Sequence, residues 1–360
     1  MIREEKSADG RLVRSLRLVA PGTTLYEGLE NILRARTGAL IVVGDSEEVL
    51  KLCDGGFHID GDLNPANLYE LAKMDGAIIV SRDAKRILLA NTHLAPDALI
   101  PSLETGTRHR TAQRVAVQTG ELVVAISQRR NVITLYQGQA KYVLQDVGVI
   151  LAKAQQALNT LERYKTVLEQ VLTSLTALEF EDLATAFDVA TAIQRAQMVA
   201  RIANEIERYI AELGSEGRLV SMQLDELMVD IEDEGLLVIR DYLRSNGENK
   251  PEDVWEQLFS WSSEDLLDLT LIVRALGLGG GLNVLESLVT PRGYRILTKI
   301  PRLPFPVIDN LVGAFGSLPK TIEASIDQLD GVEGIGEVRA RAIKEGLRRL
   351  REQTLIDRHA

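Results

Sequence analysis

One long stripe of apolar side chains constrains the fold of this chain more than any other feature. From Gly148 onward, apolar residues recur at alternating spacings of three and four, at Ala154, Ala157, Leu161, Tyr164, Leu168, Val171, Leu175 and Leu178. This heptad-like spacing places them on one face of a single long helix. A second long helix is expected from about Leu183 to Leu213, ended by Gly214. We predict an antiparallel helical spine, which either mediates oligomerisation and spacing or packs within one chain.

Composition limits the class of protein. The length of 360 residues suggests two or three domains. No apolar run approaches the ~20 residues that span a membrane, and the segment Met1 to Ala20 has no signal-peptide core. The single cysteine, Cys53, excludes an internal disulfide framework and a thiolate zinc site, and it fits a reducing cytoplasm. With a net charge of −11, any contact with nucleic acid has to come from a local basic patch.

The region before the spine alternates helical and strand-like segments. Apolar runs at 39–43, 78–80 and 86–90 predict buried strands, with a helix at 24–36 before the first strand and another at 63–73 before the second. Three further strand-like runs follow at 122–126, 132–135 and 141–144. We therefore expect an α/β domain, with a mixed sheet flanked by helices, over residues 1–145. An all-α helical linker and oligomerisation domain should follow at 146–300, and an all-α domain at 301–360.

A cluster of phosphate-type donors lies in the α/β domain. Gly106 is followed by Thr107, Arg108, His109, Arg110 and Thr111, with no apolar residue among them. Guanidinium groups match phosphate oxygens, and the free N–H groups of a helix start add neutral donors. The alternative is a solvated basic helix start. The cluster alone does not decide between the two.

An aspartate upstream could supply the acidic partner of such a site. Asp75 precedes a buried strand and is followed by Gly76 and Ala77. A carboxylate there could bind Mg²⁺ or accept a proton from a hydroxyl, although a turn aspartate is the more common case. No P-loop motif and no early dinucleotide-binding Gly-x-Gly-x-x-Gly motif is present. Together, the carboxylate and the phosphate cluster are the parts that metal-assisted nucleotidyl transfer needs.

These two segments together resemble the paired motif of the diadenylate cyclase family. Ser127 and Arg130, in the segment Ala125 to Arg130, also resemble that family's strand-end serine and arginines. The resemblance runs essentially end to end and extends to the members with a DNA-binding C-terminus. It implies that two ATP molecules condense to cyclic di-AMP and two pyrophosphates, with Mg²⁺ or possibly Mn²⁺ as the metal.

The resemblance also assigns roles to residues. Asp75 would assist the attacking 3′-hydroxyl or hold the metal, and catalysis would also involve Arg108 and His109. His109 is expected to act as a neutral hydrogen-bond donor to phosphate rather than as a general acid. The ATP-binding residues would be Gly76, Ala77, Leu94, Gly106, Thr107, Arg108, His109, Arg110, Thr111, Ser127 and Arg130. Because two ATPs must meet face to face, we expect a homo-oligomer with facing cyclase domains, an octamer by resemblance.

The end of the chain carries a helix–hairpin–helix pattern. Gly334, Ile335 and Gly336 form the expected hairpin, and the second helix should start near Glu337. The two glycines let backbone N–H groups approach a DNA phosphate, and the isoleucine packs the hairpin down. Basic side chains crowd the following helix and supply the local patch, with Arg339, Arg341, Lys344 and Arg348 as the expected DNA contacts. The alternative is a glycine turn used only for packing.

We therefore expect an enzyme, a nucleotidyltransferase whose output is coupled to branched or damaged DNA that it binds without reading sequence. The resemblance implies a bacterial, cytoplasmic protein near the nucleoid with a role in DNA repair. The alternative is an architectural DNA-binding protein that binds a nucleotide without cyclase activity.

Overall fold

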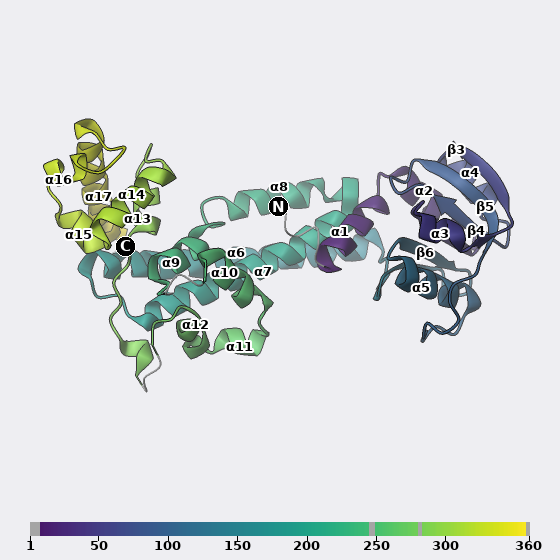
Figure 1. Cartoon of the computed structure of the whole chain (residues 1–360), viewed down its shortest axis with the longest axis horizontal. Helices are drawn as coiled ribbons and strands as arrows, with labels where there is room; N and C mark the ends of the chain where they lie inside the picture. The colour runs from purple at the N-terminus through teal and green to yellow at the C-terminus, as the bar shows by residue number, and fades with distance from the viewer. Residues whose placement is uncertain (1–7, 245–248, 280–282, 358–360) are drawn as a thin grey trace. The chain divides into compact units, whose positions relative to one another are not determined.

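The structure is a computed structural model that describes residues 8–244, 249–279 and 283–357. The first seven residues, the last three and the two internal gaps lie outside the described residues. Contacts group the chain into two compact units: residues 1–156 with 206–222, and residues 157–205 with 223–360. Figure 1 shows the elements of both. In the described residues, we find no helix with the length and apolar content to cross a bilayer.

Unit 1 is built on a mixed sheet. Its strands lie in the order β2-β5-β4-β1-β6-β7-β8, with β3 paired to β5. Among the described strands, only β1 and β4 pair in parallel, and the other pairs are antiparallel. The strands are β1 (Ala39–Val43), β2 (Cys53–Asp54), β3 (Phe57–Asp62), β4 (Ala77–Val80), β5 (Arg86–Leu94), β6 (Leu122–Ser127), β7 (Val132–Gln137) and β8 (Ala140–Val143).

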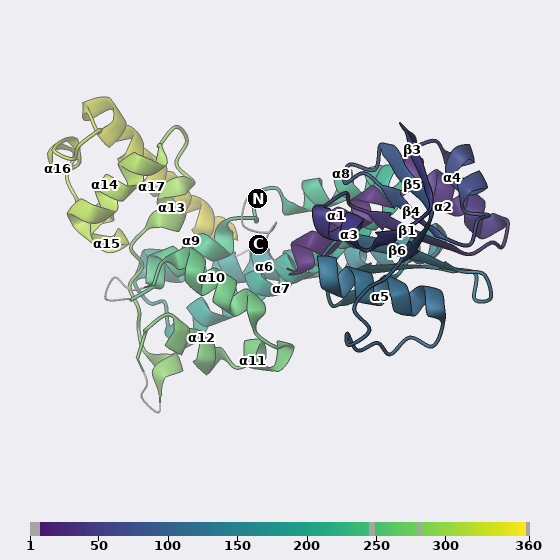
Figure 2. The same cartoon turned by 45° about the vertical axis from the view of Figure 1, so that its right-hand side comes forward.

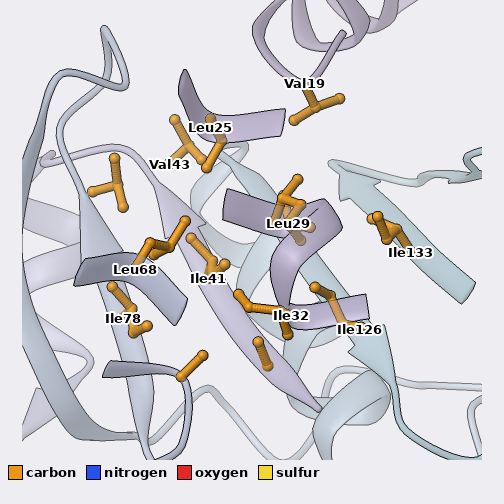
Figure 3. Packing of buried hydrophobic residues seen from close by; sticks show 14 of the residues in the cluster. Val19, Leu25, Leu29, Ile32, Ile41, Val43, Leu68, Ile78, Ile126 and Ile133 are labelled. Carbon is orange, nitrogen blue, oxygen red and sulfur yellow. The ribbon is translucent and has the colours of Figure 1, made fainter. Parts of the chain in front are cut away.

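Helices cover both faces of this sheet, which confirms the expected α/β domain. Because side chains alternate along a strand, Ile41 and Val43 of β1 face one core while Leu40 and Val42 face the other. The first core packs under α1 (Ala8–Leu18), α2 (Thr24–Arg34) and α4 (Pro65–Leu71), and Figure 3 shows Leu25, Leu29 and Ile32 pointing at the strands. The second core packs under α3 (Glu47–Lys51) and α5 (Thr107–Thr119).

Three strands differ from the sequence-based expectation, and the first is the two-residue β2, which no apolar run marks. β3 was not expected, because its side chains are largely exposed and do not form an apolar run. β5 continues past Ala90 to Leu94, through three polar residues whose strand character comes from pairing with β4 and β2 rather than from composition.

The expected spine is present as two long helices. They are α6 (Val147–Glu181) and α7 (Ala186–Leu213), which lie side by side in Figures 1 and 2. Leu161, Leu168 and Leu175 of the apolar stripe are buried within the single chain. Because these side chains already pack against other residues of the same chain, packing within one chain explains most of the apolar stripe.

The regular elements of unit 2 in its described residues are helices, apart from one isolated bridge between Thr185 and Leu288. Its further helices are α9 (Glu234–Tyr242), α10 (Pro251–Ser260), α11 (Ser263–Leu267), α12 (Leu269–Ala275), α13 (Tyr294–Thr298), α14 (Phe305–Phe315), α15 (Leu318–Glu323), α16 (Ile326–Asp330) and α17 (Glu337–Asp357), while α8 (Arg218–Met228) straddles the division between the units. The apolar stretch 266–276 could form a single helix by its composition, but the chain breaks at Asp268. That residue ends α11 and its carboxylate caps α12 through the Thr270 N–H.

A buried polar cluster ties three helices of unit 2 together. The Arg295 guanidinium of α13 is fully buried and forms ion pairs with Glu179 of α6 and Glu234 of α9. The Asp241 carboxylate of α9 accepts backbone N–H bonds from Gly293 at 2.7 Å, Tyr294 at 2.6 Å and Arg295 at 3.0 Å. The first turn of α13 is therefore capped by a side chain from another helix.

Candidate active site

One pocket in unit 1 brings the two predicted segments together. It has a volume of about 380 Å³, within the range of small-molecule sites. It lies at the edge of the sheet where β4 begins, where β5 ends and where α5 starts. Its lining residues are Leu40, Asp75, Gly76, Ala77, Thr92, His93, Leu94, Thr107, Arg108 and Thr111.

The strand pairing explains this meeting. β5 runs antiparallel to β4 with Thr92 opposite Ala77, so the end of β5 lies beside the start of β4. Gly76 approaches Asn91 so closely that a Cβ on Gly76 would lie 2.3 Å from the Asn91 carbonyl carbon. The Gly76 N–H donates to the Asn91 side chain at 3.1 Å, and Asn91 itself has a φ of 54°. Glycine at 76 thus lets the segment that carries Asp75 lie directly against β5.

The start of α5 supplies donors to the same pocket. Gly106 is the N-cap residue and has no side chain with which to cap the helix, so the first-turn N–H groups are available to an anion. Thr107, Arg108 and Thr111 share the face that lines the pocket. The Arg108 guanidinium lies over Gly38, where a Cβ would come within 2.0 Å of its Nη1 atom. Two glycines therefore make room for the carboxylate-bearing segment and for the arginine.

Five of the predicted binding residues do not line this pocket. They are Gly106, His109, Arg110, Ser127 and Arg130. Arg110 is exposed and donates from Nε to the Glu104 carbonyl at 3.2 Å. Ser127 ends β6 and accepts from the Arg130 N–H at 3.2 Å. His109 points to β7, where its Nδ1 lies 3.0 Å from the Tyr136 hydroxyl.

Three pocket residues were not among the predicted binding residues: Leu40, Thr92 and His93. Leu40 belongs to the buried run of β1, so its residue type predicts only a place in the hydrophobic core. Thr92 and His93 lie in the strand end that the sequence left unassigned, and alternation places them on opposite sides of β5. Recognising 91–94 as a continuation of β5 would have brought both to the Asp75 edge.

A divalent metal ion fits this pocket only if the protein and a bound substrate hold it together. Among the described residues, we find no group of three or more His, Cys, Asp or Glu side chains that could hold a metal ion. Asp75 is an exposed carboxylate at the pocket. Mg²⁺ is commonly held by one or two carboxylates together with substrate phosphates and water, and this donor set suits that arrangement.

The glycine turn between α16 and α17 matches the expected hairpin in its backbone. Gly334 has a φ of +82°. The next residue, Ile335, is buried in the hydrophobic core formed by helices α13 to α17. Gly336 is exposed, and a Cβ there would meet no atom within 4 Å. The Asn310 side chain of α14 donates to the Glu333 carbonyl at 3.0 Å and so helps hold the turn.

The basic residues of this region are not equivalent. Arg339 donates to the Gly334 carbonyl, and Arg341 pairs with Glu337 one turn earlier. Lys344 donates to the Ile322 carbonyl of α15 at 2.6 Å, which gives it a structural role. Arg348 is exposed, and with Arg341 and Lys344 it lines a groove of about 540 Å³.

Comparison with known proteins places this architecture. A family model described as "DisA bacterial checkpoint controller nucleotide-binding" matches residues 26–141, and one described as "DisA bacterial checkpoint controller linker region" matches residues 144–285. The DNA integrity scanning protein DisA of Carboxydothermus hydrogenoformans is 62% identical over 346 residues, covering 96% of this chain and 98% of that protein. The chain belongs to the DisA family.

Other DisA proteins agree with this assignment. The DisA protein of Clostridium botulinum, strain Loch Maree, is 58% identical over 350 residues, covering 97% of this chain and 98% of that protein. A solved structure of a DacA double mutant from Staphylococcus aureus is 20% identical, with a TM-score of 0.29, and covers 38% of this chain and 89% of that chain. That score is too low to compare the folds. All the pocket residues fall within the part that matches the DisA nucleotide-binding model.

Proposed function

We propose that this protein is a diadenylate cyclase that joins two ATP molecules into cyclic di-AMP with release of two pyrophosphates. The observation that carries the proposal is the single pocket that unites the Asp75 carboxylate with the donors of Thr107, Arg108 and Thr111. The match to the DisA nucleotide-binding model and the full-length DisA relatives support a nucleotide as the ligand.

The residues of the pocket suit distinct parts of the proposed chemistry. The α-phosphorus of one ATP is attacked by the 3′-oxygen of the other, and the P–O bond to pyrophosphate breaks. Asp75 accepts the hydroxyl proton, while Arg108 and the N–H groups of the α5 start hold the phosphate oxygens as negative charge shifts toward the leaving group. When bound, a Mg²⁺ or Mn²⁺ ion would neutralise phosphate charge, with Asp75 as its protein ligand.

The reaction requires a second chain. The described residues of unit 1 form one such pocket in each chain. Cyclisation uses two ATPs in opposed orientations. We therefore propose a homo-oligomer in which two of these pockets face each other. The loop before α5 supports an interface there, because the Leu99 and Leu103 side chains are 88% and 97% exposed in the single chain.

The α16–α17 region is the proposed DNA contact. The exposed Gly336 lets a phosphate approach the hairpin backbone, and the cations of α17 add electrostatic attraction. Contacts of this kind recognise backbone shape rather than base sequence, which suits branched or damaged DNA. The long helices α6 and α7 would connect DNA binding with cyclase activity.

The deciding experiment is to incubate the purified full chain with ATP and Mg²⁺ or Mn²⁺ and to measure cyclic di-AMP, with and without branched DNA. We expect Asp75→Asn to abolish synthesis and to leave DNA binding unchanged. Asp62→Asn, which changes another exposed aspartate of the same sheet, is the control and should keep full activity. If the wild type binds ATP but makes no product, the architectural alternative is correct. If Asp75→Asn is fully active, the role of this carboxylate is wrong.

A further inference from the structure

The loop that leads into α5 is bound to the sheet through a carboxylate. This loop, residues 95–106, joins the end of β5 to Thr107, the first residue of α5. The Glu104 carboxylate lies 2.5 Å from the Lys141 ammonium of β8, and only 13% of the Glu104 side chain is exposed. The two groups carry opposite charges at neutral pH. The contact is therefore an ion pair whose acidic partner is largely shielded from solvent.

The strand pairing explains why Lys141 faces this loop. Lys141 of β8 pairs directly with Tyr136 of β7, and directly opposed residues share a face of the sheet. Tyr136 belongs to the core that packs under α5. The next residue of β8, Tyr142, packs against the other core, and its hydroxyl donates to Glu212 of α7 at 2.5 Å. Strand β8 thus has a side-chain bond on each face, and the one on the α5 face reaches Glu104.

The backbone of Glu104 is held against α5 itself. Its carbonyl accepts from the Arg110 Nε at 3.2 Å. Its N–H donates to the Ser102 hydroxyl at 3.2 Å, and that hydroxyl donates to the Gln113 side chain at 2.5 Å. The main chain of Glu104 is therefore bonded to the helix while its carboxylate is bonded to β8. Glu104 joins the beginning of α5 to the edge strand of the sheet.

The first turn of α5 carries donors that line the pocket. Thr107 and Arg108 follow Glu104 by three and four positions, and both line the pocket, as Asp75 does. Asp75 precedes β4, so its separation from these donors depends on where α5 begins over the sheet. The helix buries small apolar side chains against the sheet, at Ala112, Val115 and Ala116. Apolar contact is non-directional, whereas the ion pair fixes the beginning of the helix in one place.

We propose that Glu104 and Lys141 are positioning residues that fix the first turn of α5 over the sheet, so that Thr107 and Arg108 meet the transferring phosphate opposite Asp75. Neither Glu104 nor Lys141 lines the pocket, so both act through the donors of α5. Without the ion pair every group of the pocket is still present, but the helix start is free to shift. This inference rests on the proposed function, because it takes the triphosphate as the ligand of these donors.

The shift should affect the chemical step more than ATP binding. In the ground state the donor side chains can follow the phosphates, whereas the transition state requires the 3′-oxygen, the phosphorus and the leaving oxygen in line. A displacement of roughly half an ångström would cost ~10-fold in rate, since 1 Å costs ~10²-fold. A lower kcat with an unchanged KM is the pattern of an interaction that matters only in the transition state.

The first test measures kcat and KM for cyclic di-AMP formation by the full chain. Lys141→Met should lower kcat about tenfold and change the KM for ATP by less than about twofold. Lys141→Arg should keep the wild-type kcat, because a guanidinium also pairs with a carboxylate. Tyr142→Phe is the matched control, because it removes the side-chain bond of β8 on the opposite face and should leave kcat unchanged.

A double variant tests whether the two side chains act as a pair. Glu104→Gln combined with Lys141→Met should be no slower than the slower of the two single variants, because the second change removes an interaction that is already lost. Effects that multiply would overturn the pairing. A wild-type kcat in Lys141→Met, or an equal loss in Tyr142→Phe or Lys141→Arg, would overturn the positioning role.

The second test needs no activity. Amide hydrogen exchange of the full chain without nucleotide should be at least about threefold faster over residues 104–111 in Lys141→Met than in the wild type. Tyr142→Phe and Lys141→Arg should match the wild type in this segment. Equal exchange in all four proteins would overturn the proposal even if the enzyme is active. If the wild type makes no cyclic di-AMP, the proposed function is wrong, and the exchange rates still decide whether the ion pair holds the start of α5.

Discussion

Adding one methyl group at Gly76 should disable the pocket without changing any functional side chain. The Cβ of Gly76→Ala would lie 2.3 Å from the Asn91 carbonyl carbon and 2.5 Å from its Cα, whereas ordinary contacts begin at 3.4 Å. The two backbone segments must therefore separate by roughly 1 Å. Asn91 cannot easily yield, because its φ is already positive and its side chain accepts from the Gly76 N–H.

Two magnitudes follow from this displacement. Overpacking of this kind costs about 1–3 kcal/mol of folding free energy. A shift of ~1 Å between groups that must align in the transition state costs ~10²-fold in rate. We expect Gly76→Ala to remain folded but to make cyclic di-AMP about a hundredfold more slowly. Denaturant unfolding and the rate of product formation from ATP measure the two effects.

The control is Gly61→Ala in β3, where the nearest atom to the new Cβ is at 3.6 Å and the contact is ordinary. It should leave both stability and rate close to those of the wild type. If Gly76→Ala retained the wild-type rate and stability, the close approach of Gly76 to Asn91 would not be what positions Asp75.

Two further predictions concern unit 2. Arg295→Met should lower the free energy of unfolding by about 3–5 kcal/mol, because it leaves the fully buried Glu179 without its counter-charge, and thermal unfolding measures the loss. Replacing Arg341 and Arg348 together by glutamine should reduce the slope of log affinity for DNA against log salt by about 1.8, since each phosphate contact contributes about 0.9. An unchanged slope would mean that DNA contacts another surface of the protein.

The sequence predicted the elements whose residue types carry a strong local signal. The buried run of β1 and the start of α5 at Thr107 lie where expected, and so does the long stripe of α6. Strand β3 was missed because its side chains lie mostly in solvent. The break at Asp268 is not evident from the sequence, because its role as a helix cap depends on the hydrogen bond that its carboxylate accepts from the Thr270 N–H.

The candidate site shows the same limit more sharply. Asp75, Arg108 and Thr111 could be named from their types, but their meeting depends on the register of β4 against β5, which no local pattern specifies. The contact of His109 with Tyr136 joins a helix start to a strand later in the chain. Tyr136 looks like an ordinary core residue in the sequence, so only the structure shows that its hydroxyl faces the histidine.

The buried cluster around Arg295 has a mechanical consequence. Sliding α13 along α6 by a single turn would leave the guanidinium and its carboxylate partners uncompensated in a dry interior, at a cost of several kcal/mol for each ion. That cost approaches the whole stability of a typical domain, about 5–15 kcal/mol. Around Arg295, helices α6, α9 and α13 should therefore resist sliding past one another.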